Sequence, residues 1–208
     1  MKRVFFSDFD GTITKVDTCD LLVTKLARKG WKEINALWME KKISTEECAS
    51  MTFRLIDAGP KEVQELIETV EIDEHFLDFL HLCRKQGHDI YILSDGYDFI
   101  IDMVLKRYKI DVPYYANQMI YQNGFKIACP YLNPDCGQCG TCKSSLMEKL
   151  KGDAEQVIYI GDGASDTCPA SKADLVYAKD YLYQYCLEKG IPVVRFETFL
   201  DIIKHLGL

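Results

Sequence analysis

The chain has 208 residues, of which 48% are hydrophobic and 27% charged, which suits one folded domain with at most a modest insertion and excludes an intrinsically disordered chain. Its 25 Lys and Arg are outnumbered by 32 Asp and Glu, so a net charge of −7 argues against nucleic-acid or anionic-membrane partners. The start lacks the apolar run of a secretory leader, and no stretch approaches the roughly 18 apolar residues of a membrane span, so we expect a cytoplasmic protein.

Short apolar runs alternate with helical patterns along the chain. Continuous runs predict buried strands at residues 4–7, 89–93 and 156–160, and weaker runs predict two more at 175–178 and 193–196. Apolar strands of this length, separated by helices, are typical of a parallel sheet with both faces covered. We therefore predict an α/β fold with a doubly wound, Rossmann-like parallel sheet as its core.

The segment between the first two predicted strands is too long for a simple crossover and has helical periodicity throughout. Within it, Ser44 and Glu47 have the spacing of a capping box. We predict a small helical cap at residues 15–72, inserted after the first strand. The core domain would then consist of residues 1–14 and 73–208.

The region after the second predicted strand is less regular. A helical pattern covers residues 99–108, and Asn123-Gly124 lies between two short apolar runs. Asn-Gly in this setting is a strong signal for a two-residue β-hairpin. The next segment, CPYLNPDCGQCGTCK, contains too much Gly, Pro and Cys for regular structure.

Two carboxylates follow the first predicted strand directly, in the sequence DFDGT. Asp8 and Asp10 would therefore lie at the carboxyl end of a parallel strand, where doubly wound sheets bind ligands. There, one carboxylate could attack phosphorus and the other could transfer protons. Because a lone DxDG is also common in acidic turns, the motif gains its weight from the sites that accompany it.

Two phosphate-binding candidates fall at the ends of other predicted elements. Ser94-Asp95-Gly96 ends the second strand, and its hydroxyl and backbone N–H groups can hold phosphate oxygens, although alone it would suit a turn or a helix cap. Lys143 precedes an amphipathic helix. A single lysine is usually a solvated side chain, and this one matters only because a site that binds phosphate beside two carboxylates needs one cation.

A fourth motif, GDGASD, follows the third predicted strand. Asp162 and Asp166 are separated by small residues, as suits a loop that binds Mg²⁺ through hard oxygen ligands. An acidic turn is again the alternative. All four motifs lie at strand ends or helix starts, and this order makes the set specific although each member is common.

The four motifs together resemble the haloacid dehalogenase superfamily of phosphatases. The matching elements are DFDGT, Ser94, Lys143 and GDGASD. The predicted helical insertion is similar to the type 1 cap of that superfamily, as in phosphoserine phosphatases. A narrower resemblance, to the methionine-salvage phosphatases, rests on SDGYDFII, the cysteine-rich segment ending in CKSS, and GDGASDTCPASKADLVYAKDYL.

The resemblance implies a covalent mechanism. Asp8 is implied to be the nucleophile that forms an aspartyl-phosphate. Asp10 is implied to protonate the leaving alkoxide and then to take a proton from the attacking water.

The resemblance also implies the ligands of a metal ion and of the phosphate. Mg²⁺ would be held by the Asp8 side chain, the Asp10 backbone carbonyl and Asp162. Asp166 would orient metal-bound waters or Lys143. The remaining phosphate oxygens would be bound by Ser94, Asp95, Gly96 and Lys143.

Four of the nine cysteines lie close together, with the spacing C-x6-C-x2-C-x2-C. They are Cys129, Cys136, Cys139 and Cys142. The C-x2-C spacing is compatible with tetrahedral zinc, and we predict a structural zinc ion that positions the loop before Lys143. Disulfides, an iron–sulfur cluster and reduced thiols are the alternatives.

Two charged residues of the predicted cap are candidates for substrate contact. Asp17 lies where type 1 caps place an acidic residue near the substrate, and Arg54 could meet an anion, although both also suit solvated charges. Ser-Asp-Gly stands where phosphoserine enzymes have Ser-Gly-Gly, which argues against phosphoserine.

The resulting functional hypothesis is a Mg²⁺-dependent phosphomonoesterase for a small molecule, with 2-hydroxy-3-keto-5-methylthiopentenyl-1-phosphate as the first candidate substrate. The alternatives are a phosphatase for phosphoserine or a phosphorylated amino alcohol, and a metabolite-binding module on the same fold. The second of these would be expected to have lost the nucleophile or the lysine, and the sequence retains both.

Overall fold

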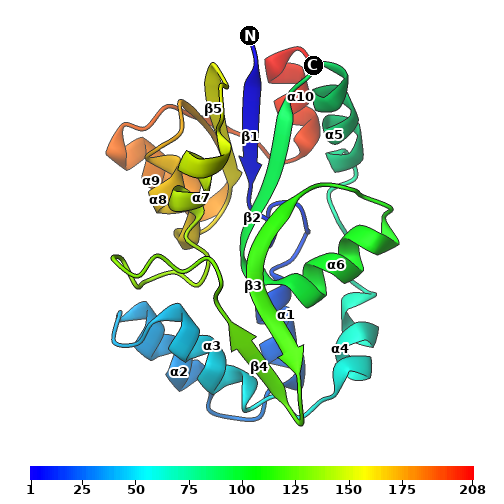
Figure 1. The fold of residues 1–208 in the computed structure, drawn as a ribbon, viewed down its shortest axis with the longest axis vertical. Coiled ribbons are helices and arrows are strands. Elements are labelled where there is room, and N and C mark those ends of the chain that lie inside the picture. Colours follow the sequence, from blue (N-terminus) through cyan, green and yellow to red (C-terminus); the bar gives the residue numbers. More distant parts are fainter.

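A computed structural model describes residues 1–208 and contains one seven-stranded sheet with the order β4-β3-β2-β1-β5-β6-β7 (Figure 1). The strands are β1 (Arg3–Ser7), β2 (Asp89–Tyr97), β3 (Tyr114–Tyr121), β4 (Phe125–Ala128), β5 (Gln156–Gly161), β6 (Leu175–Ala178) and β7 (Val193–Arg195). All neighbouring strands pair in parallel except β3 and β4, which form an antiparallel hairpin. The predicted α/β, doubly wound architecture is confirmed.

Helices cover both faces of the sheet, which explains the continuous apolar runs. On β1, Phe5 contributes to the larger hydrophobic cluster, whereas Val4 and Phe6 contribute to the smaller one on the opposite face. Buried residues of α5 (Phe76–Lys85), α6 (Asp98–Arg107) and α10 (Phe199–Leu206) complete the larger cluster. Buried residues of α7 (Lys143–Leu150), α8 (Thr167–Ala170) and α9 (Asp180–Lys189) complete the smaller one.

Four helices occupy the chain between β1 and α5. They are α1 (Thr18–Leu26), α2 (Trp31–Met39), α3 (Thr45–Phe53) and α4 (Pro60–Ile67). The Ser44–Glu47 capping box is present at the start of α3, and the Asp17 carboxylate caps α1 by accepting from the backbone N–H of Asp20 at 2.8 Å. In Figure 1 these helices lie at the end of the sheet toward which β1 runs.

The structure differs from the sequence prediction in the extent of two strands. β2 continues beyond residue 93 to Tyr97, with a register shift against β3 between Leu93 and Tyr97. β3 begins at Tyr114 and lies in the main sheet, whereas we expected only a short hairpin strand near residues 119–121. The polar residues Asn117 and Gln118 interrupt the apolar pattern of β3, which hid its first half.

The β3–β4 hairpin lies against α3 although the two are far apart in the sequence (Figure 1). The ring of Phe53 meets that of Tyr97 edge to face at 4.7 Å, and the ring of Phe125 lies 6.0 Å from it. The cysteine-rich segment also contacts α3, because the Gln138 carbonyl accepts from the N–H and the hydroxyl of Thr45. The helical insertion is therefore tied to two later parts of the chain.

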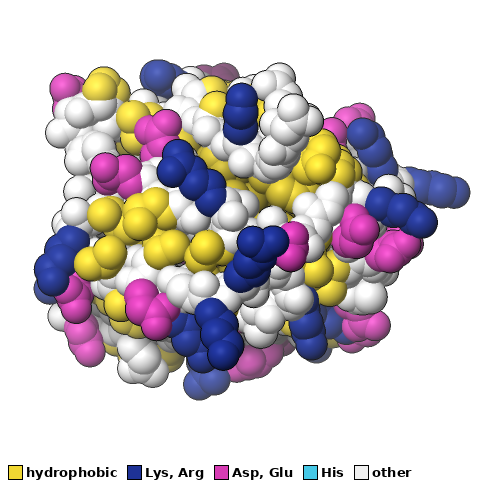
Figure 2. All heavy atoms as spheres, turned by 90° about the horizontal axis from the view of Figure 1, so that it is seen from below, with side chains coloured by type: hydrophobic (Ala, Val, Ile, Leu, Met, Phe, Trp, Pro, Cys, Tyr) yellow, Lys and Arg dark blue, Asp and Glu magenta, His cyan; other side chains and the backbone are white.

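The end of the molecule that carries the insertion has a mixed surface. Figure 2 views this end and shows hydrophobic patches between scattered basic and acidic side chains. Exposed large hydrophobic residues of α2, α3 and the hairpin include Met39, Met51, Ile120 and Tyr121. None of the helices combines the length and the apolarity that crossing a membrane would require.

Candidate active site

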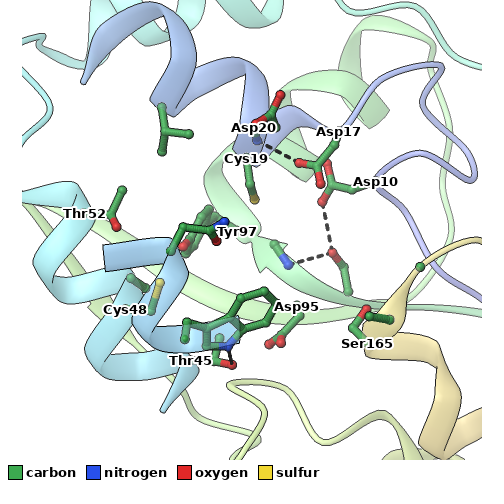
Figure 3. A pocket seen from close by; sticks show the side chains of 18 of the residues that line it. Asp10, Asp17, Cys19, Asp20, Thr45, Cys48, Thr52, Asp95, Tyr97 and Ser165 are labelled. Carbon is green, nitrogen blue, oxygen red and sulfur yellow. Dashed lines mark hydrogen bonds between the residues drawn. The ribbon is translucent and has the colours of Figure 1, made fainter. Parts of the chain in front are cut away.

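A cavity of about 540 Å³ lies between the carboxyl ends of β1, β2 and β5 and the inner side of α1, α2 and α3 (Figure 3). The strand side supplies Asp8, Asp10, Ser94, Asp95, Gly96, Asp162 and Ser165. The parallel sheet thus brings segments that are more than 60 residues apart in the sequence to one place. This is the position at which doubly wound sheets bind ligands.

Lys143 lies at the buried bottom of this cluster. It begins α7 and is 3% exposed. Its Nζ lies 2.9 Å from Asp8 Oδ1 and 2.6 Å from Asp166 Oδ1, and it donates to Ser165 Oγ at 3.2 Å. Burial lowers the pKa of Lys143, but the carboxylates of Asp166 and Asp8 outweigh burial and raise it above the ordinary value. The ammonium is therefore a fixed positive charge beside Asp8.

Asp8 lies directly after β1, and its backbone N–H donates to the Ile160 carbonyl of β5 at 2.8 Å. Its Oδ1 also accepts from the N–H of Phe9 at 2.7 Å, whereas its Oδ2 accepts no hydrogen bond within the protein. Burial and the Asp166 carboxylate raise the pKa of Asp8, and Lys143 opposes that rise. One carboxylate oxygen is thus held in place and the other is available to a ligand.

Asp10 reaches the same cavity from the loop after β1. Its Oδ1 accepts from the N–H and the hydroxyl of Thr18 at 2.8 and 2.5 Å, and its Oδ2 accepts a long hydrogen bond from Ser94 Oγ at 3.5 Å. Burial, with a contribution from Asp17, raises the pKa of Asp10 to about 6, against the opposing effect of Thr18. A carboxyl group with this pKa can both release and accept a proton near neutral pH.

The irregular part of β2 presents Ser94 and Gly96 to the cavity. The N–H of Gly96 donates to Ser94 Oγ at 2.9 Å, and this hydroxyl lies 3.5 Å from Asp10 Oδ2, so the two groups lie together opposite Asp10. The carboxylate of Asp95 accepts from the N–H of Thr141 at 2.8 Å and from Asn117 Nδ2 at 3.1 Å. Because its carboxylate is occupied, Asp95 would contact a phosphate oxygen through its backbone N–H.

Asp166 is fully buried and all of its acceptor capacity is directed inward. Its Oδ1 accepts from Lys143 and from the hydroxyl of Tyr159, each at 2.6 Å. Its Oδ2 accepts from the N–H groups of Asp162 and Gly163, each at 3.0 Å. Lys143 and these hydrogen bonds lower the pKa of Asp166 although burial alone would raise it. Asp166 thus holds both the lysine and the loop after β5.

Three carboxylates form a group that fits a hard divalent cation. Oxygens of Asp8, Asp162 and Asp166 lie within 4.8 Å of one another. Burial raises the pKa of Asp162 to about 6, although Thr12 Oγ1 donates to it at 2.5 Å. A Cβ on Gly11, whose φ is +71°, would lie only 2.6 Å from Asp162 Oδ2, so the chain passes very close to this carboxylate. Since the oxygens of Asp166 are already occupied, Asp8 and Asp162 are the available ligands.

The opposite wall of the cavity is largely aromatic and apolar. It includes Val23, Trp31, Trp38, Ala49 and Phe53, together with Cys19 and Cys48, and the ring of Tyr97 at the end of β2 lies against Phe53. Trp38 is fixed by its Nε1, which donates to Thr45 Oγ1 at 3.0 Å. The lining residues include six aspartates but no lysine, arginine or histidine. A bound molecule would therefore meet a wall whose only charged members are Asp17 and Asp20, opposite the strand side where the buried Lys143 lies beside Asp8.

Of the remaining predicted site residues, one lines the cavity and the others do not. Asp17 lines the cavity while it caps α1 (Figure 3). Arg54 ends α3, is exposed, and is absent from the cavity lining. The four clustered cysteines are free thiols, and the structure does not gather their sulfurs into a group that could hold a metal ion. Burial raises the pKa of Cys129 to about 11 and that of Cys139 to about 12.

Several residues of the site were missed from the sequence. Thr18 and Tyr159 bind Asp10 and Asp166, respectively, but a threonine at a helix start and a tyrosine in an apolar strand have ordinary structural explanations. Trp31 and Trp38 could have been found, because they are seven residues apart and so share one face of α2.

Comparison with known proteins agrees with this geometry. A family model described as "Putative Phosphatase" matches residues 3–192. A 2-hydroxy-3-keto-5-methylthiopentenyl-1-phosphate phosphatase from Lysinibacillus sphaericus is 36% identical, over 98% of this chain and 93% of that protein. One of the same name from Exiguobacterium sibiricum is 33% identical, over 96% of this chain and 94% of that protein.

Solved structures of phosphoserine phosphatases share the fold. One, a phospho-aspartyl intermediate analogue, has a TM-score of 0.76 at 21% identity, with 98% of both chains covered. Another, with bound substrate, has a TM-score of 0.75 at 20% identity and covers 99% of this chain and 98% of that one. The family match over most of the chain, together with relatives above 30% identity along nearly its whole length, shows that this protein belongs to the family described as "Putative Phosphatase".

Proposed function

We propose that this phosphatase hydrolyses a small-molecule phosphomonoester through an aspartyl-phosphate on Asp8. A carboxylate oxygen of Asp8 attacks phosphorus, and the bond between phosphorus and the alkoxide oxygen breaks. Water then attacks phosphorus, the bond to Asp8 breaks, and inorganic phosphate leaves. The observation that carries this proposal is the buried contact of Lys143 with Asp8, next to a cavity that Asp10 also lines.

Asp10 would serve both proton transfers. In the first displacement it gives its proton to the departing alkoxide oxygen, and in the second it takes a proton from the attacking water. Its pKa of about 6 suits both roles near neutral pH. The two hydrogen bonds from Thr18 orient the carboxyl group and leave Oδ2 directed toward Ser94.

The phosphoryl oxygens would be bound by four groups of the strand side. These are the Ser94 hydroxyl and the backbone N–H groups of Asp95 and Gly96, which line the cavity, and the Lys143 ammonium, which lies beside Asp8 and would exchange its hydrogen bond to Ser165 for a phosphate oxygen. Lys143 already balances part of the negative charge of Asp8 and Asp166, so an arriving phosphate meets less repulsion.

The cluster of three carboxylates around Asp8 fits Mg²⁺. Asp8, Asp162 and the Asp10 backbone carbonyl would hold this ion. When bound, this ion supplies positive charge that offsets the repulsion between the nucleophile and the phosphate. Asp166 would then act on Lys143 and on the loop after β5 rather than on the ion.

The aromatic wall supports a substrate whose far end is uncharged or weakly polar. The relatives above 30% identity are named for 2-hydroxy-3-keto-5-methylthiopentenyl-1-phosphate, whose methylthio end would suit a wall of Trp31, Trp38 and the thiols of Cys19 and Cys48. Phosphoserine fits less well because no lysine, arginine or histidine lines the cavity to receive its carboxylate. A phosphorylated amino alcohol is the second candidate, since Asp17 and Asp20 line the same wall.

The helical insertion would act as the cap of this site. Residues 15–72 supply most of the wall opposite the strand ends, and residues 1–14 with 73–208 supply most of the strand side.

A structural zinc ion at the four clustered cysteines is a further proposal, and it rests on their spacing alone. Metal analysis of protein purified without added zinc tests it: about one equivalent supports it, and none, with four titratable thiols, refutes it.

A panel of phosphate esters tests the proposed function. Phosphate release would be measured with the methylthio ketose phosphate, phosphoserine, phosphoethanolamine and phosphocholine, each with and without Mg²⁺. We expect Mg²⁺-dependent hydrolysis with the highest kcat/KM for the methylthio compound. Turnover of none of these esters would contradict the proposal, and a preference for phosphoserine would contradict the assignment of the wall.

A further inference from the structure

A buried asparagine outside the four sequence motifs lies between two of the phosphate-binding segments. Asn117 is on β3 and is 1% exposed. Its side chain hydrogen-bonds both Asp95 of β2 and Thr141, which precedes Lys143 by two residues. We propose that Asn117 is a positioning residue that fixes these two segments relative to each other for phosphate binding. This inference rests on the proposed function.

The first contact stabilises the irregular part of β2. Regular pairing between β2 and β3 is interrupted between Leu93 and Tyr97, where the register shifts. Within that interval, Asn117 Nδ2 donates to the backbone carbonyl of Asp95 at 2.7 Å and to its Oδ1 at 3.1 Å. The side chain therefore supplies a donor where the strand ladder is broken. This shape of β2 is what presents Ser94 Oγ and the N–H of Gly96 to the cavity.

The second contact fixes the loop that carries Lys143. Thr141 is fully buried, and its Oγ1 donates to Asn117 Oδ1 at 3.2 Å. Its backbone N–H donates to Asp95 Oδ1 at 2.8 Å, so the three residues form one connected network. A Cβ on Gly140 would lie 2.5 Å from Asn117 Oδ1, which shows how closely the loop crosses the amide. The irregular segment before Lys143 is therefore attached to the sheet at the point where α7 begins.

The chemistry of this place requires an amide. The two N–H bonds of Asn117 reach the oxygens of Asp95, and its carbonyl oxygen accepts from Thr141. A carboxylate here would face the Asp95 carboxylate and lose both donors. An apolar residue would leave the buried oxygens of Asp95 and the hydroxyl of Thr141 without this partner, which is costly in a dry environment.

The test compares Asn117→Ala and Asn117→Asp with Gln118→Ala, an exposed neighbour on the same strand. The affinity for inorganic phosphate in the presence of Mg²⁺ would be measured by calorimetry, and KM and kcat with a phosphomonoester. Circular dichroism and thermal melts would report the folded fraction. We expect both Asn117 variants to bind phosphate at least about tenfold more weakly. Their kcat/KM should fall by about 10²-fold, because small errors in position are costly. Gln118→Ala should match the wild type.

The split between parameters separates positioning from a purely structural role. Loss of folded protein lowers the apparent kcat but leaves KM and the phosphate affinity of the remaining molecules unchanged, whereas misplaced ligands change all three. A folded Asn117→Ala protein with wild-type phosphate affinity and KM would overturn the proposal. If that variant does not fold, Thr141→Val, which removes only the hydroxyl donor, must bind phosphate more weakly, and wild-type affinity there would equally overturn it.

Failure of the proposed function gives a different result. A wild-type protein that turns over no phosphomonoester would remove that function, while the phosphate affinities of the variants would still be compared directly. Equal phosphate affinity across wild type, Asn117→Ala and Asn117→Asp would remove the positioning role alone.

Discussion

The two sides of the cavity are built in opposite ways. On the strand side, four of the five residues of β1 are buried, and Lys143 and Asp166 have their donors and acceptors occupied by specific partners. On the helical side, α2 contributes two tryptophans to the cavity but has no buried residue. Charged groups of a reaction centre need fixed positions, whereas recognition of an apolar end needs mainly shape and dispersion contacts. Under the proposed function, chemistry and selectivity would reside on separate sides of the cavity and could be altered separately.

The largest expected effect is on the strand side. Asp8→Asn should lower kcat by at least about 10⁴-fold, because a carboxamide keeps the shape but is a very poor nucleophile. Phosphate release would be measured together with circular dichroism, with Gln118→Ala as the folded control. Substantial turnover by a folded Asp8→Asn protein would show that Asp8 is not the nucleophile.

Asp10→Asn should slow both displacement steps by about 10²–10⁴-fold with an alkyl phosphate. With p-nitrophenyl phosphate the leaving group needs little protonation, so single-turnover kinetics should show the larger defect in dephosphorylation. Equal defects in both steps with this substrate would contradict the dual role. Unchanged rates in both steps would show that another group carries out the proton transfers.

A change on the helical side should have a smaller and different effect. Trp38→Ala should raise KM for the methylthio substrate by about tenfold and leave kcat nearly unchanged, because it removes contact area far from phosphorus. Met39→Ala, at an exposed neighbouring position of α2, is the matched control. A Trp38→Ala protein with normal KM but a low kcat would break the division between the two sides.

The smallest effect concerns stability and has a defined sign. The pKa of Asp162 is about 6 in the folded protein against 3.8 ordinarily, so the folded state binds more protons between these values. Metal-free wild-type protein should therefore lose stability as the pH rises through this range, a loss that Asp162→Asn avoids. We expect Asp162→Asn to raise the Tm of the metal-free protein by a few degrees at about pH 8 and to change it little near pH 4.

Mg²⁺ provides the control for this stability prediction. It should raise the Tm of the wild type and have a much smaller effect on Asp162→Asn, because binding to the folded state stabilises it. An equal Mg²⁺ effect on both proteins would contradict the assignment of Asp162 as a ligand.

The strand side was the more predictable of the two from the sequence. Asp8, Asp10, Ser94, Lys143 and Asp162 each follow a predicted strand or begin a predicted helix, and a parallel sheet brings such ends together. Their convergence at one edge of the sheet follows from the topology.

The rest depended on contacts between distant segments. Asn117 lies on β3, and the polar residues of that strand kept its first half from being predicted. Thr45 and Gln138 are hydrogen-bonded although they are 93 positions apart in the chain. Arg54 was a plausible anion contact by sequence, yet the structure leaves it exposed at the end of α3, outside the cavity lining. Periodicity indicates which face of a helix is apolar but not whether that face meets the core or a cavity, as Trp31 and Trp38 illustrate.

The most direct test of the account is to trap the covalent intermediate. Wild-type protein would be quenched with acid during turnover, reduced with borohydride, which converts an aspartyl-phosphate to homoserine with release of phosphate, and then digested with trypsin. The peptide of residues 4–15, which contains Asp8 and Asp10, would be analysed by mass spectrometry. We expect conversion of Asp8 to homoserine in the wild type and no such change in Asp8→Asn. Rapid turnover with no reduction at Asp8, or reduction at another residue instead, would contradict the role of Asp8 as the nucleophile.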